Sequence, residues 1–148
     1  MIGEINKKNQ LVEQLQQEIS QLEANNKYVE RNYILDAKMA STRIFKHFNN
    51  YAENRRTKPN EEDWEKLIRM VEDTLPSFKP IVRGKSRVEG DDYRVCVLVR
   101  LGFTPTKVCS VTEKNYDYVT KVRKRLLKKI FHIDGHAKDF DSMIMNIV

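Results

Sequence analysis

Apolar residues recur at helical spacing along most of the chain, and the clearest pattern lies between residues 92 and 131. Turn residues divide it into three segments: 92–101, 105–112 and 116–131. Gly102 follows the first segment, where a helix C-cap commonly falls. Thr104 and Pro105 open the second with a hydroxyl at the N-cap and proline at the first helical position, and Asn115 caps the third. This succession predicts a helix-turn-helix.

The last of these segments has two different faces when it is drawn as a helix at about 100° per residue. Its apolar residues fall within one narrow arc: Val119, Val122, Leu126 and Ile130. Six of the nine residues from Lys121 to Lys129 are basic, and most of them lie opposite that arc. A charge run alone more often marks a solvated surface helix. The turn and short helix before it favour a recognition helix, which packs one face on a core and presents the other to the DNA major groove.

The stretches RVCVLVRLGFTPTKV, VRKRLLKKIF and KDFDSMI resemble the C-terminal helix-turn-helix of LuxR/NarL-type regulators. They resemble more closely the variant that ends certain bacterial tetratricopeptide-repeat regulators, and EDWEKLIRMVEDTLPSFKP resembles the segment before it. The resemblance covers about residues 60–148. It implies a four-helix DNA-binding domain whose third helix enters the groove and whose fourth closes the core. It also implies that repeats, and often a membrane helix, precede the domain in a longer protein.

The chain departs from this family pattern at a few positions. Asp92 stands where the family usually has glutamate, and Val108-Cys109 replaces Ile-Ala in the second helix. Lys114 stands, after Glu113, where an apolar residue normally plugs the turn between the second and third helices. The first two changes keep the chemical character of the family residue, whereas Lys114 does not.

We expect the DNA contacts to come from the second and third helices of this domain. A helix N-terminus attracts anions, so phosphates are expected at Thr104 and Lys107. Base edges are expected to meet the exposed residues after the Asn115 cap: Tyr116, Asp117, Thr120, Lys121 and Lys124. Flanking phosphates are expected at Arg125 and Lys128.

Arg123 is the member of the basic run that does not fit the DNA-facing arc. It points about 40° from the centre of the apolar stripe, so its side chain is expected to be partly buried. An unpaired charge there is costly, and the guanidinium therefore needs a carboxylate. We expect Asp92 of the first helix to supply it, with Glu89 or Asp91 as substitutes.

The net charge of +6 is concentrated in the same part of the chain. Residues 1–80 hold 13 Lys/Arg and 13 Asp/Glu, whereas residues 81–148 hold 14 and 8. A polyanionic partner, here double-stranded DNA, requires such a distribution. No P-loop, nucleophile motif or paired-carboxylate group supports catalysis, so we expect neither enzyme activity nor a cofactor.

Residues 2–36 follow a heptad pattern. The dimerisation residues that we expect occupy its core positions: Ile5, Val12, Ile19 and Asn26 at a, and Leu15, Leu22 and Val29 at d. β-branched residues at a, leucine at d and a single asparagine at a favour a parallel two-stranded coiled coil, and hence a homodimer. The alternative is an amphipathic helix docked on its own domain, since about four heptads are marginal for an isolated coil.

The sequence as a whole predicts an all-α protein in three parts: a coiled coil over 1–36, a helical connector over 37–82 and a helix-turn-helix domain over 83–148. In the connector, Ser41 and Asn60 are expected to cap helices, and Trp64 to pack in a core. Residues 82–92, with two glycines and mixed charge, are the expected linker. The last residues, from Lys138 onward, are expected to form the fourth helix of the domain.

Cys96 and Cys109 are expected to be buried small hydrophobic residues, because their spacing fits no metal or redox motif. Reduced thiols agree with a cytoplasmic location. His132 and His136 are separated by a glycine in an expected loop, which argues against a metal site. The longest apolar run, Val95 to Val99, is far shorter than a membrane span, and no signal peptide is evident. The helical pattern starts without a capping sequence, which suggests the C-terminal part of a longer regulator.

Two functions from different classes are compatible with these patterns. The favoured one is a DNA-binding transcriptional regulator that acts as a dimer. The competing one is a protein-interaction module with a degenerate helix-turn-helix, which engages a partner protein through the coil and the third helix. Asp117 supports the second, because phosphates repel a carboxylate unless it accepts from a cytosine amine.

Overall fold

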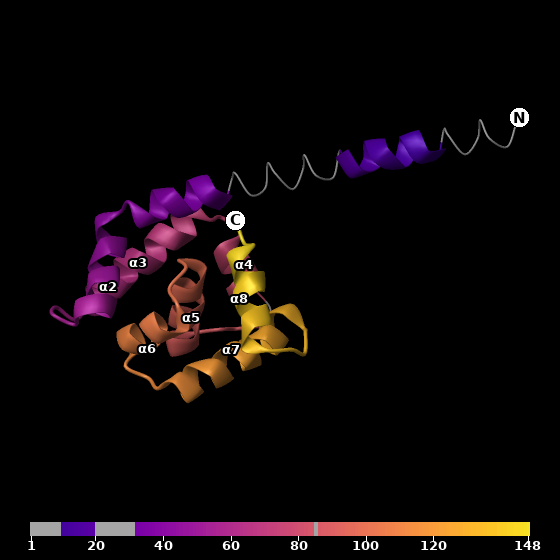
Figure 1. Ribbon diagram of the computed structural model, residues 1–148. Coiled ribbons are helices and arrows are strands. Elements are labelled where there is room, and N and C mark those ends of the chain that lie inside the picture. Colours follow the sequence, from indigo (N-terminus) through magenta and orange to yellow (C-terminus); the bar gives the residue numbers. More distant parts are fainter. Residues whose placement is uncertain (1–9, 20–31, 85) are drawn as a thin grey trace, which may run out of the picture. The chain divides into compact units, whose positions relative to one another are not determined.

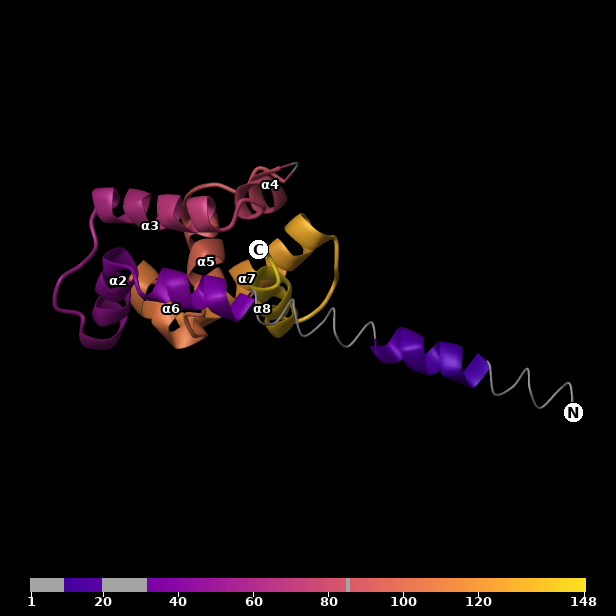
Figure 2. The same cartoon turned by 90° about the horizontal axis from the view of Figure 1, so that it is seen from above.

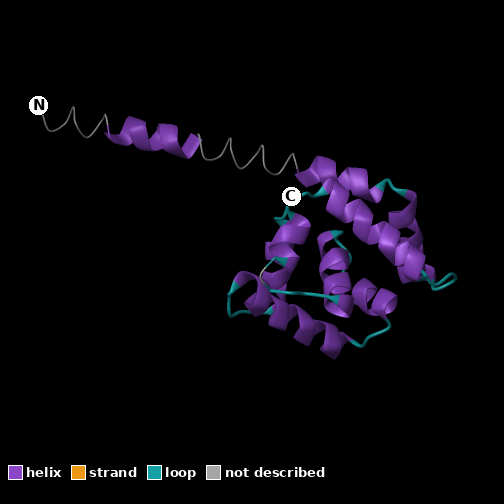
Figure 3. Ribbon diagram, turned by 180° about the vertical axis from the view of Figure 1, so that it is seen from behind, coloured by secondary structure: helices purple, strands orange, loops and turns teal. Residues whose placement is uncertain are grey.

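The computed structural model describes residues 10–19, 32–84 and 86–148, and every regular element in these ranges is a helix (Figures 1 and 3). The expectation of an all-α protein is therefore confirmed. The chain forms two compact units, Met1–Ile34 and Leu35–Val148. No helix within the described ranges is long and apolar enough to cross a membrane.

In the N-terminal unit, residues 10–19 are helical. Four apolar side chains of this helix are exposed: Leu11, Val12, Leu15 and Ile19. The last three belong to the expected coiled-coil core and share one side of the helix by their spacing. The other expected core residues lie outside the described part of the chain: Ile5, Leu22, Asn26 and Val29.

The second unit begins with helical residues 35–40 and continues through the helices labelled in Figure 1. Their bounds are α2 (Arg43–Asn54), α3 (Glu61–Thr74), α4 (Phe78–Arg83), α5 (Gly90–Arg100), α6 (Pro105–Thr112), α7 (Tyr116–Phe131) and α8 (Ala137–Met145). The helices expected over 105–112 and 116–131 and after Lys138 are confirmed. α4 was not expected as a separate helix.

Local capping explains where these helices begin and end. Asn60 caps α3 in a capping box with Asp63, and Asn115 accepts a hydrogen bond from the Tyr118 N–H at 2.7 Å. At the end of α5, Gly102 has φ 85° and its N–H donates to the Val99 carbonyl, while the next N–H donates to the Leu98 carbonyl. This pair of bonds is a Schellman motif, which favours glycine at its left-handed position.

The cap expected at Ser41 is wrong by one residue. Thr42 is the N-cap of α2, and its Oγ1 accepts a hydrogen bond from the Phe45 N–H at 3.2 Å. Ser41 instead donates to the Lys38 carbonyl at 2.7 Å and belongs to the turn before the helix. Both hydroxyls suit a cap, and only the backbone geometry decides between them.

The segment expected as a linker, 82–92, contributes buried side chains to the core at its described residues. Val82 and Val88 are fully buried, and α5 begins within the segment. Arg83 donates from Nε to the Val88 carbonyl at 3.2 Å, and its guanidinium lies 4.0 Å from the centroid of the Tyr93 ring. Burial of its valines therefore fixes this short connection.

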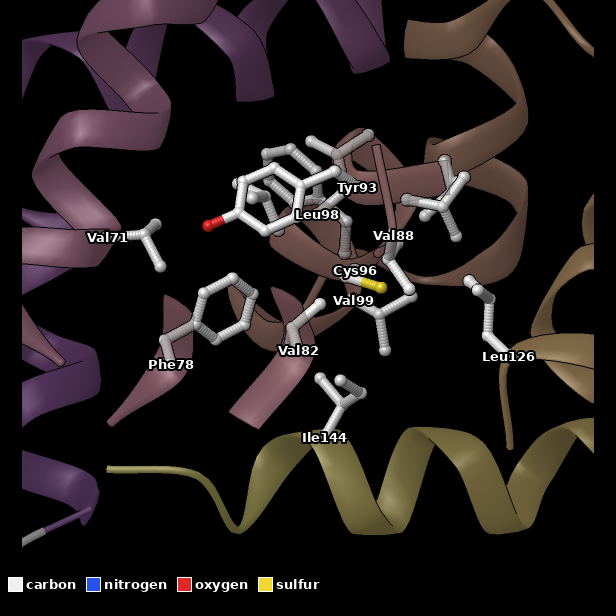
Figure 4. Close-up of a cluster of buried hydrophobic side chains, with 14 of the residues drawn as sticks. Val71, Phe78, Val82, Val88, Tyr93, Cys96, Leu98, Val99, Leu126 and Ile144 are labelled. Carbon is white, nitrogen blue, oxygen red and sulfur yellow. The ribbon is translucent and has the colours of Figure 1, made fainter. Parts of the chain in front are cut away.

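The core of the second unit is built around α5 (Figure 4). Every residue of this helix from Val95 to Arg100 is buried, as expected of a helix that other helices surround. The neighbouring helices contribute side chains that converge on it: Val71 from α3, Phe78 and Val82 from α4, Leu126 from α7 and Ile144 from α8. Helices from the first and the second half of the unit therefore share one hydrophobic core.

α2 and α3 belong to the same body as the helices that follow them (Figures 1 and 2). The ring of Phe48 in α2 lies edge-on to Trp64 in α3, with 4.7 Å between centroids. Phe45 in α2 lies 5.4 Å from Phe103, just before α6. Trp64 is thus a core residue, as expected. The compact unit extends from Leu35 to Val148, so the boundary expected near residue 83 does not separate two bodies.

Candidate nucleic-acid interface

The turn between α6 and α7 determines how α7 leaves the core. Glu113 in this turn has φ 59°, a left-handed conformation that residues other than glycine rarely adopt. Its carboxylate accepts hydrogen bonds from Lys58 Nζ at 2.9 Å and from Tyr51 Oη at 3.1 Å. These two contacts, first Lys58 and then Tyr51, lower the pKa of Glu113. The end of α2 and the loop after it therefore hold the turn in place.

The N-terminal end of α7 presents aromatic rings to solvent. Tyr116 and Tyr118 are both exposed, and Lys114 Nζ lies 5.3 Å from the centroid of the Tyr118 ring. Lys114 is itself exposed, so its ammonium lies on the surface of the turn before α7. A cation and two rings are the kinds of group that contact bases and phosphates.

Of the two residues that were expected to meet phosphates at the start of α6, Thr104 is exposed and Lys107 is half-buried. Thr104 caps α6, where its Oγ1 accepts the Lys107 N–H at 3.3 Å. The Lys107 ammonium lies on α2, 3.0 Å from Asn49 Oδ1 and 3.1 Å from Glu53 Oε1. The ammonium that was expected to meet a phosphate is therefore already paired with a carboxylate of α2.

α7 has the two faces that its sequence predicts. The expected apolar residues are all buried: Val119, Val122, Leu126 and Ile130. The opposite face exposes most of the residues expected at DNA: Tyr116, Asp117, Lys121, Lys124, Arg125 and Lys128. Thr120 differs, because its hydroxyl oxygen is shielded from solvent without a hydrogen-bond partner in the described part of the chain. In this conformation its hydroxyl is not accessible to a base edge.

Carboxylates neutralise part of this cationic face. Three ion pairs lie on the exposed face of α7 in the described residues: Lys121 with Asp117 at 2.9 Å, Arg125 with Asp92 at 3.1 Å, and Lys128 with Asp134 at 3.2 Å. Their cations are exposed, so each pair contributes little to stability and can exchange with an external anion. Within the described residues, no carboxylate forms an ion pair with Lys124.

The expected partner of Arg123 is wrong. Arg123 is buried, with 3% of its surface exposed, but its guanidinium contacts both carboxylate oxygens of Asp141 on α8. Asp92 pairs instead with Arg125, two residues further along α7. The physical expectation of a carboxylate for a buried guanidinium is met. It ties α7 to α8, because α8 packs against this side of α7.

A groove of about 870 Å³ lies between the C-terminal half of α7 and the loop that follows it. We refer to it as the basic groove. Residues of α7 form one wall: Lys121, Lys124, Arg125, Lys128 and Lys129. The loop forms the other: Ile133, Asp134, Gly135 and His136. Lys129 and the loop were not among the expected DNA contacts, although Lys129 ends the basic run that begins at Lys121.

Arg100 is a second buried cation, and no pattern in the sequence indicates its role. It is completely buried at the end of α5, where its Nε donates to the Ile147 carbonyl at 2.8 Å and its Nη1 to Asp36 Oδ1 at 2.6 Å. These bonds join the start of the second unit to α5 and to the residues after α8. Asp36 is 64 positions away in sequence, beyond any local periodicity.

The remaining candidate ligands have local structural roles. Cys96 is buried and Cys109 half-buried, and burial raises the pKa of both thiols. His132 ends α7 with φ 58°, and His136 precedes α8. Within the described ranges, no group of three or more His, Cys, Asp or Glu residues is placed to hold a metal ion.

Comparison of the chain with protein-family models, with curated proteins and with solved structures gives no match.

Proposed function

We propose that the chain is a double-stranded-DNA-binding regulator of the helix-turn-helix type, in which α7 enters the major groove. The observation that carries the proposal is α7 itself, with one face buried in the core and the other exposing tyrosines and a row of cations. The order of α5, a glycine turn, α6, a fixed turn and α7 supports it. No catalytic activity is part of this proposal.

The residues of the interface follow from their exposure. Tyr116, Asp117 and Lys121, near the N-terminal end of α7, would meet base edges, as the first residues of recognition helices do. The start of α6 would contact the phosphate backbone through Thr104 and Lys107. Thr120 does not join this set, because its hydroxyl oxygen is shielded.

A homodimer formed by the N-terminal heptads completes the proposal. Two copies of α7 would then bind two half-sites, about one helical turn or a multiple of it apart. The exposed apolar residues Val12, Leu15 and Ile19 support pairing, because a lone helix in water gains nothing from exposing them.

A protein-interaction module is the second candidate, and the carboxylates around α7 favour it. Asp117, Asp92 and Asp134 each pair with one cation of the exposed face and reduce its net positive charge. In that function the tyrosines at the start of α7 would contact a partner protein.

Substitution of Lys121 by alanine tests the proposal. If Lys121 contacts a base, Lys121→Ala should weaken binding to a preferred duplex by about 1–3 kcal/mol and change the sequence preference. Fluorescence anisotropy with a randomised and then a selected duplex measures both effects. Lys46→Ala, an exposed lysine on α2 without an ion pair among the described residues, is the matched control. Binding that Lys121→Ala leaves unchanged would show that this face of α7 does not meet bases.

A further inference from the structure

The basic groove lies beside the C-terminal half of α7, whereas recognition helices usually read bases with their N-terminal residues. It lies between a helix wall and a loop wall, and both walls belong to the second unit. A positively charged groove at this end of the helix therefore suits a contact other than base recognition.

The loop wall of the basic groove has a defined shape. His132, at the end of α7, adopts φ 58°, and its N–H donates to the Lys128 carbonyl at 3.0 Å. Asp139 of α8 accepts the His136 N–H at 2.8 Å. A Cβ on Gly135 would approach Asp139 Oδ2 to 2.5 Å, so only glycine fits this close packing without displacing the carboxylate. The groove is therefore present before a ligand binds.

The charge of the basic groove is strongly positive. Its lining carries five Lys or Arg side chains from α7 and one carboxylate, Asp134. Asp134 pairs with Lys128, and no other carboxylate in the described residues pairs with Lys128, Lys124 or Lys129. These three lysines can therefore contact an external anion at the cost of one weak surface ion pair.

The ligand that suits this groove is an extended polyanion. The cations extend from Lys121 to Lys129, which is about 12 Å along the helix axis, while successive phosphates of one DNA strand are about 3.4 Å apart along the duplex axis. Arg125 and Lys128 are 54% and 60% exposed. A small anionic ligand needs buried donors that converge on one point, whereas solvated cations in a row suit phosphates that release counterions.

We propose that the basic groove holds the sugar-phosphate backbone of one DNA strand, with Lys124, Lys128 and Lys129 as its phosphate contacts and the loop 132–136 as its outer wall. This inference rests on the proposed function and assigns different roles to the two halves of α7. The turns up to Lys121 read bases, and the turns after it hold the backbone. Lys124, which the sequence placed at a base edge, then contacts a phosphate.

Two substitutions test the groove in the full chain: one removes a positive charge and the other removes a negative charge. Lys129→Ala removes a phosphate contact, so it should weaken binding a few-fold for every duplex tested and reduce the slope of log affinity against log salt by about one. Asp134→Asn removes the carboxylate of the groove, so it should strengthen binding to the same duplexes. Fluorescence anisotropy with several unrelated duplexes at a series of salt concentrations measures both effects.

The controls carry the same charge changes on helices away from the groove. Lys46→Ala on α2 and Glu65→Gln on α3 change exposed side chains that form no ion pair in the described residues. Figures 1 and 2 both show these helices apart from the C-terminal half of α7. Thermal melts of all four variants identify any loss of affinity that follows from unfolding, since Lys129 also stabilises the C-terminal end of α7.

The outcomes separate this inference from the proposed function. If Lys129→Ala and Asp134→Asn match their controls while Lys121→Ala weakens binding, the basic groove does not hold DNA and the proposed function stands. A change of sequence preference in Lys129→Ala would make Lys129 a base contact and would also overturn the inference. If the wild-type chain binds no duplex at low salt, both proposals fail. Binding to phosphatidylserine vesicles that depends on Lys129, without binding to DNA, would assign the groove to a membrane surface instead.

Discussion

Arg123 shows how one residue of the basic run can stabilise the fold while the neighbouring cations, Lys124 and Arg125, stay exposed. Its guanidinium is buried and paired with Asp141, which is partly exposed. Removal of the guanidinium leaves a carboxylate that water can solvate, whereas removal of the carboxylate leaves a buried unpaired cation. The two halves of this pair therefore permit a matched test of its role.

We expect Asp141→Ala to destabilise the protein by about 3–5 kcal/mol, because it leaves a buried unpaired cation, and Arg123→Ala by about 1–3 kcal/mol, because water can solvate the remaining carboxylate. Both should lower the Tm in a circular-dichroism melt. Duplex affinity at a temperature where both variants are folded should fall little and equally. A large loss of affinity in Arg123→Ala alone, with an unchanged Tm, would make Arg123 a DNA contact.

Lys107 was expected to meet a phosphate, but its ammonium is already paired within the protein. Glu53 of α2 lies 3.1 Å from its ammonium, on the edge of the molecule where a phosphate was expected. We predict that Glu53→Gln increases duplex affinity about two- to five-fold at low salt, because it removes a competing carboxylate a few ångströms from the proposed phosphate position. Glu65→Gln, on α3, is the control. Weaker binding of Glu53→Gln in a titration would show that Glu53 positions Lys107 for DNA and does not compete with it.

At the scale of single helices, the sequence could predict those helix ends and faces that depend on residues close together along the chain. The start of α3, α6 and α7 followed from Asn60, Thr104 and Asn115, because a cap depends only on a side chain and the next three residues. The end of α5 followed from Gly102, because a glycine readily adopts the left-handed conformation that closes a helix. The apolar stripe of α7 followed from its period.

What the sequence could not predict depends on contacts between helices. Asp92 and Asp141 each pair with a cation of α7, and only the packing of α8 assigns Arg123 to Asp141. The burial of Arg100 likewise depends on Asp36 and the Ile147 carbonyl, which are distant from it in sequence and accept its hydrogen bonds. The basic groove likewise exists only because the loop 132–136 folds back beside α7.

The N-terminal heptads also carry a prediction at this scale. If residues 5–33 form a parallel dimer with Asn26 facing Asn26, Asn26→Leu should strengthen association and loosen the choice of oligomer, because leucine removes the polar pair that selects two strands. Sedimentation equilibrium over a range of concentrations measures both. A wild-type chain that is monomeric at tens of micromolar would contradict the dimer.

At the scale of the whole molecule, the distribution of charge supports both DNA binding and the role of the basic groove. The excess of six positive charges lies within residues 81–148, and the structure gathers many of these cations on the exposed face of α7 and in the basic groove. α2 and α3 complete the same compact unit, and Tyr51 of α2 and Lys58 of the loop after it hold the turn before α7 through Glu113. The segments that the sequence divides into connector and domain thus act together in placing the interface.

The most direct test of DNA binding is a titration of the wild-type chain with duplex at increasing salt. Five cations of the proposed interface can meet phosphates: Lys107, Lys124, Arg125, Lys128 and Lys129. At about 0.9 per phosphate, log affinity should fall against log salt with a slope of about −4 to −5 for each protomer. A slope near zero, or no binding at about 50 mM salt, would contradict DNA binding and favour a protein partner.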